Sequence, residues 1–204
     1  KTGLMTPAQI RATYTDKGYD ADTKWYNYFQ QFNTPQFQND ITIEGGGNKV
    51  AYMVGASQYH QKGNTIGNFY DKYSIRSNIQ ARPKDWMKFG MNIGITYDKT
   101  QRNGGWSSNS DGFSNYVDGG LSYLLNPLYP AIDPETGKEY EIKYPSGMYN
   151  QHYYMSKMPD YYKRYGFFGA FNVEIEPVKN LKIASRAGID GGFSENDYVR
   201  YPSY

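Results

Sequence analysis

The 204-residue sequence contains no cysteine, and it has no long run of apolar residues. Without cysteine, disulfide bonds and thiolate metal sites are excluded. No stretch approaches the roughly 20 consecutive apolar residues of a membrane-spanning helix, which excludes a helical membrane protein. Apolar residues make up 38% of the chain and its mean hydropathy is -0.82. A membrane β-barrel tolerates such values, because its strands need apolar residues on the lipid face alone.

The sequence also lacks a large excess of one charge, since it contains 22 basic and 20 acidic residues. A nucleic-acid-binding protein would carry a strongly basic face, so nucleic acid is not an expected partner. Aromatic residues and glycine are abundant instead, with 23 Tyr, 10 Phe, 3 Trp and 22 Gly. Tyrosine joins a flat apolar ring to a hydroxyl group, which suits β-sheet surfaces, membrane interfaces and sugar-binding faces.

No catalytic constellation is found, so we expect neither an enzyme nor a cofactor or metal site. His60 and His152 are the only histidines, and both fall in or beside expected loops. Glu174 and Glu176 share one face of an expected strand, which favours polar rim residues over the paired carboxylates of a glycosidase. Acidic residues at 133–141 miss the spacing of a calcium loop and indicate a turn. Residues 45–47 lack the Gly-Lys-Ser/Thr sequence of a phosphate loop.

Residues 1–36 are predicted to form a short helical segment. Residues 6–9 read Thr-Pro-Ala-Gln, a capping-box pattern with proline at the first helical position. A second helix is predicted to begin near Asp22 or Thr23 and to end before Pro35. Its apolar face would carry three aromatic residues at helical spacing: Trp25, Phe29 and Phe32.

From residue 37 the hydrophobic period changes from 3.6 to 2, which predicts β-strands. The clearest strand covers residues 87–97, where apolar side chains alternate with polar residues and glycine without a break. Weaker alternation predicts five more strands at residues 37–45, 49–60, 70–81, 164–176 and 181–191. About 11 residues at roughly 3.3 Å per residue span about 36 Å. Tilted by about 45°, such strands cover the roughly 25 Å apolar band of an outer-membrane barrel.

The connections between these strands alternate between short and long. Tight turns are expected at residues 45–48, 82–85 and 177–180, and longer loops at 61–69 and 99–163. Brief turns at one end and extended loops at the other are typical of bacterial outer-membrane barrels. Aromatic residues near the expected strand ends fit the interfacial girdles of such barrels: Tyr59, Phe69, Tyr70, Tyr97 and Tyr165 at the long-loop end and Trp86 at the short-turn end. Six strands cannot close such a barrel, since the smallest have about eight and plugged transporters about 22. The sequence therefore predicts an all-β antiparallel meander of long transmembrane strands, part of a barrel of about 22 strands, after a short helical segment.

Five segments follow one another in a recognisable order and spacing: residues 22–25 (Asp-Thr-Lys-Trp), 37–46 (a strand ending in Gly-Gly), 49–57 (the returning strand), 73–79 (a strand with Arg76 and Asn78) and 85–93 (beginning Asp-Trp-Met-Lys-Phe-Gly). Together they resemble the region after the plug in SusC/RagA-like TonB-dependent outer-membrane transporters. Residues 121–137 resemble the next loop of that family, in which an Asn-Pro step precedes a turn ending in glycine. Lys24 stands where the family often has aspartate, and Glu44 and Gly47 lengthen the polar turn.

The resemblance implies an outer-membrane location and active uptake of oligosaccharides or peptides. Such transporters work with a SusD-like lid lipoprotein and draw energy from the TonB complex through a plug, which is absent from this chain. On this interpretation residues 1–36 connect plug to barrel, and residues 37–204 form a partial barrel that contacts lipid. Two alternatives stay open: a soluble or surface-anchored β-sandwich that binds carbohydrate, and a passive porin-type barrel.

The expected loop at 99–163 is rich in aromatic residues, Gly, Ser and Asn. Long loops in compact proteins are usually functional, and aromatic faces stack on sugars and peptide side chains. We therefore expect contacts with the substrate or the lid from Trp106, Phe113, Tyr116, Tyr123 and Tyr129. The loop could equally pack on its own aromatic residues or act as a gate. Polar residues on the other strand face would line the lumen and touch the plug: Arg76, Asn78, Lys88, Asn92 and Arg186.

Overall fold

A computed structural model of the chain describes residues 4–103, 125–141, 144, 150, 152–153, 157, 159–199 and 201. Its helices are α1 (Pro7–Thr13), a 3-10 helix (Thr15–Lys17) and α2 (Tyr26–Phe29). Its strands are β1 (Gln36–Gly46), β2 (Val50–Lys62), β3 (Phe69–Lys84), β4 (Met87–Asn103), β5 (Pro159–Val178) and β6 (Leu181–Tyr198). None of the described helices is long and apolar enough to cross a membrane.

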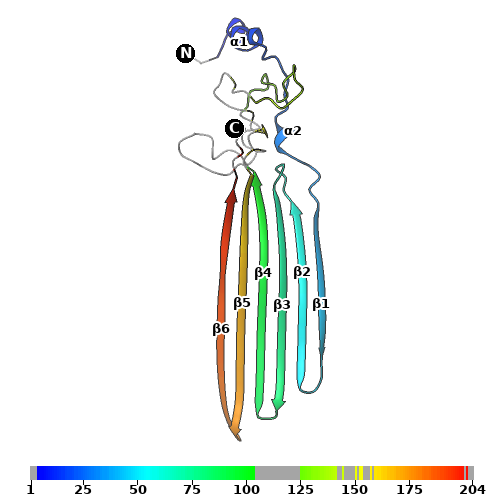
Figure 1. The fold of residues 1–204 in the computed structure, drawn as a ribbon, viewed down its shortest axis with the longest axis vertical. Helices are drawn as coiled ribbons and strands as arrows, with labels where there is room; N and C mark the ends of the chain where they lie inside the picture. Colours follow the sequence, from blue (N-terminus) through cyan, green and yellow to red (C-terminus); the bar gives the residue numbers. More distant parts are fainter. Residues whose placement is uncertain are drawn as a thin grey trace.

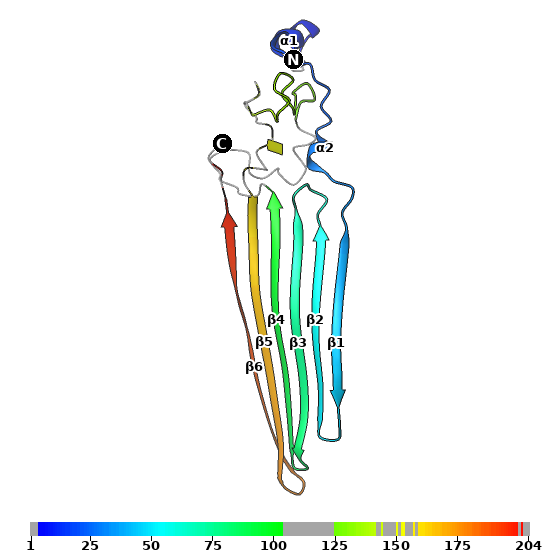
Figure 2. The ribbon, with the colours of Figure 1, turned by 45° about the vertical axis from the view of Figure 1, so that its right-hand side comes forward.

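The six strands form one antiparallel sheet in the order β1-β2-β3-β4-β5-β6. This confirms the predicted meander of long strands, as in part of a β-barrel. The strands run along the long axis of the molecule, with tight turns at one end and both α-helices beyond the other (Figure 1). The turned view of Figure 2 shows a single layer of strands, so the described residues do not form the two packed sheets of a sandwich.

The tight turns cover residues 47–49, 85–86 and 179–180, so they overlap the predicted positions but begin later because the strands before them run on. Asn180 adopts a left-handed conformation with φ of 69° between β5 and β6, and Asn tolerates this region better than most residues. Its backbone N–H donates to Glu176 Oε1 at 3.0 Å. Glu176 therefore stabilises this turn instead of forming a catalytic pair with Glu174.

Three strands extend further toward the helical end than the alternation indicated. β4 continues to Asn103, β5 already begins at Pro159, and β6 reaches Tyr198. Beyond Tyr97 polar side chains occupy both faces of the sheet, so the period of two disappears from the sequence. The backbone hydrogen-bond ladder does not depend on side-chain polarity and continues regardless. The connection between β4 and β5 therefore covers residues 104–158 instead of 99–163.

The helical segment is partly as predicted. Helix α1 has the expected capping box, in which Gln9 N–H donates to Thr6 Oγ1 at 3.3 Å and Thr6 N–H donates to Gln9 Oε1 at 2.8 Å. Helix α2 is shorter than predicted, because Gln30 is extended and pairs with Thr65 in the loop between β2 and β3. Phe32 consequently leaves the helix and is 81% exposed, whereas Phe29 is fully buried.

The buried hydrophobic residues among those described lie outside the sheet. They come from the N-terminal segment and from the connection between β4 and β5: Trp25, Phe29, Leu125, Tyr129, Ala131, Tyr144 and Tyr153. We call the described parts of residues 4–31 and 125–153 the cap. The sheet has no comparable core, since many of its large apolar side chains are exposed.

Candidate functional site

The strand register gathers apolar side chains on one face of the sheet. One row across the six strands consists of Ile41, Ala56, Ile75, Ile95, Phe167 and Gly191, and a neighbouring row of Ile43, Val54, Ser77, Ile93, Gly169 and Ile189. These rows define the apolar face. Ile41, Ile75 and Ile95 are 69%, 56% and 58% exposed. A contiguous apolar surface of this extent marks a site of contact with a partner or a membrane.

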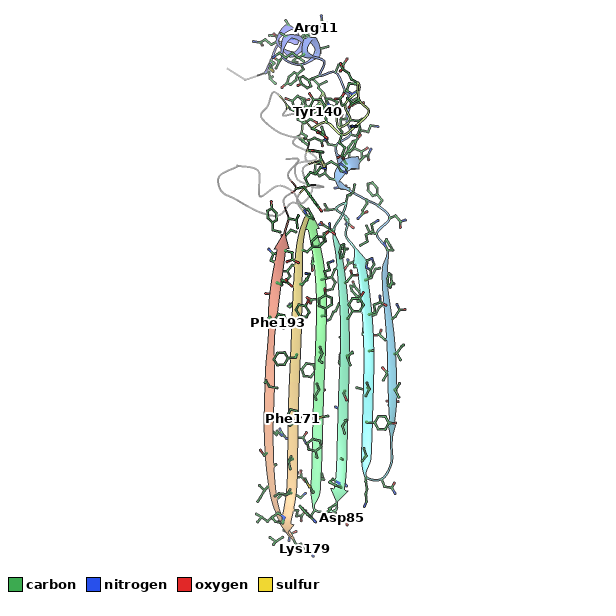
Figure 3. All side chains as sticks on the ribbon, in the orientation of Figure 1. Arg11, Asp85, Tyr140, Phe171, Lys179 and Phe193 are labelled. Atoms are coloured by element: carbon green, nitrogen blue, oxygen red, sulfur yellow. The ribbon has the colours of Figure 1, made fainter. Side chains whose placement is uncertain are left out.

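An aromatic row borders the apolar face on its cap side. The register aligns Tyr73, Tyr97, Tyr165 and Phe193 on successive strands β3 to β6. Their ring centroids are 6.3, 4.9 and 4.6 Å apart in that order. Figure 3 shows the labelled Phe193 on the cap side of Phe171 along the sheet. Aromatic rows at this position are typical of the interface between lipid and water.

Aromatic residues near the strand ends were predicted to form such a girdle, and the register divides them. Tyr97 and Tyr165 face each other within the aromatic row. Tyr59 and Tyr70, in contrast, lie on the opposite, polar face, where their ring centroids are 5.9 Å apart. Both the face of the sheet on which a side chain lies and the row to which it belongs depend on the pairing register, which the sequence alone did not provide.

A charged row follows the aromatic row on the same side of the sheet. It consists of His60, Asp71, Lys99, Lys163 and Glu195. His60 Nδ1 lies 2.5 Å from Asp71 Oδ1, and its ring stacks on Phe37 at 5.0 Å. The change from aliphatic to aromatic to charged side chains follows the polarity gradient from the core of a bilayer to its headgroups.

The polar face carries the residues predicted to line a lumen. Asn78 lies opposite Asn92, and Arg186 opposite Asn172. Lys88 Nζ lies 2.9 Å from Glu174 Oε1, so Glu174 is held in an ion pair across β4 and β5. Near the cap, Arg164 donates to both carboxylate oxygens of Asp98 through Nε, at 3.0 and 3.2 Å.

The Asp98–Arg164 pair is asymmetric. The Asp98 side chain is 4% exposed, but that of Arg164 is 61% exposed. A second Arg164 donor, Nη2, lies 2.6 Å from Asp98 Oδ1, which makes the ion pair strong and directional. The buried carboxylate thus fixes a guanidinium group that remains accessible on the polar face.

Glycines on the polar face leave room for side chains from β5. A Cβ at Gly94 would lie 2.1 Å from the ring of Phe168, and one at Gly90 would lie 2.2 Å from the amide oxygen of Asn172. Both side chains can therefore lie flat across β4.

The centre of the cap is a stack of tyrosines. The rings of Tyr129 and Tyr144 are parallel within 2° at 4.4 Å, and those of Tyr140 and Tyr144 are parallel within 10° at 5.0 Å. Trp25 and Tyr19 contact Tyr144 edge-on. Aromatic contacts of this kind add to the stability that area burial alone supplies.

Hydrogen bonds join the N-terminal segment to residues 126–131 in the cap. Thr23 Oγ1 donates to the Tyr129 carbonyl at 2.6 Å, and Trp25 Nε1 donates to the Asn126 carbonyl at 3.0 Å. The buried Asn150 side chain donates to the Ala131 carbonyl at 2.9 Å. The bonds from Thr23 and Trp25 join residues about 100 positions apart, so the two segments form one folded unit.

Burial changes the acidity of the cap tyrosines. Desolvation, followed by the hydrogen bond with the Tyr19 hydroxyl, raises the pKa of Tyr140 to about 12. Burial also raises the pKa of Tyr144, whose hydroxyl donates to the Pro130 carbonyl at 2.6 Å. Both hydroxyls therefore stay protonated well beyond the ordinary range of tyrosine.

The candidate contact residues are placed only in part. Trp106, Phe113, Tyr116 and Tyr123 lie outside the described residues. Tyr129 is described and is 1% exposed in the cap, so its ring packs within the protein and presents no surface to a ligand in this arrangement. Contact by the other four stays a prediction.

The residues weighed for catalysis or metal binding have structural partners. His152 Nδ1 pairs with Glu139, whereas His60 pairs with Asp71, so the two histidines contact different carboxylates. The Asp133 carboxylate accepts from the backbone N–H of Glu135 at 2.8 Å and closes a turn instead of a calcium loop. Within the described ranges no three potential ligands form a metal cluster.

The fold is similar to three solved structures of a transporter. The RagAB peptide importer in the "closed-closed" state matches with a TM-score of 0.73 and 19% identity, over 99% of this chain and 25% of the matched chain. The RagAB peptide transporter matches with a TM-score of 0.73 and 18% identity, over 98% of this chain and 24% of the other. The "open-open" state of the importer matches with a TM-score of 0.69 and 19% identity, over 98% and 24%.

These matches confirm the predicted SusC/RagA resemblance at the level of the fold, and the chain spans about a quarter of the matched chains. No protein-family model matches the sequence. No curated protein matches it either.

Proposed function

We propose that this chain is part of the barrel of a TonB-dependent outer-membrane transporter without catalytic activity. The observation that carries the proposal is the exposed apolar face, bordered by an aromatic row and then a charged row. In this arrangement the apolar face contacts lipid. The polar face, with the Arg164 guanidinium, lines the lumen and contacts the plug. The cap lies on the outer side of the membrane.

Peptide uptake is the first activity to test, because the matched structures are those of a peptide importer. Oligosaccharide uptake is the second, since the aromatic cap suits either ligand. In both cases a SusD-like lipoprotein would cover the cap side, and the TonB complex would supply the energy. Uptake of labelled peptide and oligosaccharide mixtures, with and without TonB, distinguishes the two substrates and also tests the passive porin alternative.

The proposed topology is testable with single cysteines, because this chain has none of its own. Lys138 is exposed in the cap, and Lys179 is exposed in the turn between β5 and β6 at the opposite end (Figure 3). In the full-length protein, a membrane-impermeant maleimide should label the Lys138→Cys variant on intact cells. It should label the Lys179→Cys variant only after the outer membrane is permeabilised.

The protein without added cysteine gives the background of this assay. Equal labelling of both variants in a soluble fraction would refute the membrane topology and favour the carbohydrate-binding alternative. Labelling of the Lys179→Cys variant alone on intact cells would reverse the assignment of the two ends.

A further inference from the structure

Two lysines lie side by side in the charged row. Lys99 on β4 is directly opposite Lys163 on β5. Like charges at opposed positions destabilise a sheet unless something neutralises them. Lys163 has such partners, since its Nζ lies 2.5 Å from Asp197 Oδ2 and 3.6 Å from Glu195 Oε2.

Lys99 lacks a comparable partner among the described residues. Its neighbour across β3 is Asp71, but the Asp71 carboxylate binds His60. The Lys99 ammonium lies instead over two aromatic rings, 4.7 Å from the centroid of Tyr161 and 5.6 Å from that of Phe69. The rings hold the cation in place but do not neutralise it.

An apolar groove lies on the same face, on the bilayer side of Lys99. It has a volume of about 420 Å³, and its apolar lining residues are Ile41, Ala56, Ile75 and Ile95, with the rings of Tyr73 and Tyr97. Ala56 pairs with Ile41 on one side and Ile75 on the other, so its small side chain makes the hollow. Ile95 and Tyr97 lie on β4 in line with Lys99, and two residues span about 7 Å of strand.

We propose that this surface binds one phosphate-bearing glycolipid of the outer leaflet, with a phosphate on Lys99 and an acyl chain in the groove beside Ala56. The site has the order that such a lipid requires: a cation, then the aromatic rings of Tyr73 and Tyr97, then an apolar slot. A lysine ammonium binds phosphate as a point charge. In a bilayer or a micelle the acyl chain leaves other apolar chains and not water, so the groove holds it by van der Waals packing. This site rests on the proposed barrel, in which the apolar face contacts lipid.

The test is native mass spectrometry of the delipidated full-length transporter in detergent, titrated with purified lipid A. We expect one lipid A to bind more tightly than the rest. Lys99→Gln, which removes the charge, and Ala56→Leu, which fills the groove, should each raise the Kd of this lipid at least tenfold. The matched control is Lys84→Gln, because Lys84 also lies over an aromatic ring, that of Trp86, 5.4 Å away near the opposite end of the sheet.

Dephosphorylated lipid A tests the phosphate contact independently of the acyl-chain contact, because it keeps the acyl chains. Its Kd for the wild type should be as high as the Kd of lipid A for the Lys99→Gln variant. The site is overturned if the Lys99→Gln variant binds lipid A as tightly as the wild type and the Lys84→Gln control do. It is also overturned if the wild type binds dephosphorylated lipid A as tightly as lipid A. Competition by inorganic phosphate at the lipid concentration would also overturn it, because it would indicate a simple anion site. A wild-type protein that folds in the outer membrane yet shows no preferred lipid contradicts this site alone, whereas a soluble wild-type protein contradicts the proposed function.

Discussion

The sheet and the cap bury hydrophobic surface in opposite ways. The cap has its own core, where Phe29 is fully buried and Tyr129 is 1% exposed. The sheet keeps Ile43 and Ile189 63% and 58% exposed although each of its six strands pairs with its neighbours in the sheet. The cap therefore has a hydrophobic core of its own, whereas the exposed apolar face of the sheet suits the lipid surrounding of the proposed barrel.

This difference predicts that the cap can open while the sheet remains folded. Phe29→Ala should destabilise the cap by about 3–5 kcal/mol, the usual cost of removing a buried phenylalanine ring. The measurement is hydrogen exchange of the full-length protein, in which backbone amides of residues 19–31 should lose protection and those of β3 and β4 should not. Phe32→Ala is the control, because Phe32 is 81% exposed and should have almost no effect. Loss of protection in the strands as well would show that cap and sheet fold as one unit.

The converse prediction concerns a charge on the apolar face. Ile189→Lys should destabilise the membrane-inserted protein by about 2–4 kcal/mol, the cost of a lysine near the middle of a bilayer. Unfolding by urea in lipid vesicles, followed as loss of the heat-resistant band on gels, measures this. Asp190→Lys introduces the same side chain at the next residue, which faces the polar side opposite Phe168. Equal effects of the two variants would contradict the assignment of faces.

A smaller effect, confined to the cap, should be seen in its stability at high pH. The folded cap holds the Tyr140 proton up to a pKa of about 12, whereas an unfolded tyrosine releases it near 10.0. The folded state binds the proton more tightly, so this stabilisation is complete below about pH 10 and is lost as the pH rises toward 12. Tyrosinate absorbance should therefore show a late-titrating group that is missing from the Tyr140→Phe variant. Identical titration curves would place the Tyr140 hydroxyl in water.

Much of the sheet was predictable because its information is local. Alternation at residues 87–97 identified β4, and the turn residues identified the hairpins, since each signal depends on neighbours in sequence. The capping box at Thr6 was predictable for the same reason. The strand ends beyond Tyr97 were not, because both faces there are polar and only backbone pairing continues.

The membership of each surface was harder to predict, because it depends on contacts across strands. Tyr59 and Tyr70 were expected in the girdle but lie on the polar face, whereas Tyr73 and Phe193 complete the aromatic row. A one-residue change of register would move every side chain of a strand to the other face. Alternation therefore shows which side chains of one strand share a face, but the register decides which face of the sheet that is and which residues form a row.

The sequence by itself determined that this protein is a meander of long strands with apolar residues on one face, because strand periodicity and turn chemistry act over a few residues. The tertiary structure decided which residues meet: Lys99 beside Lys163 above a groove at Ala56, and Trp25 and Thr23 against residues 126–131. These contacts join residues far apart in the chain. They depend on strand register and on the burial of aromatic rings in the cap, which no local pattern encodes.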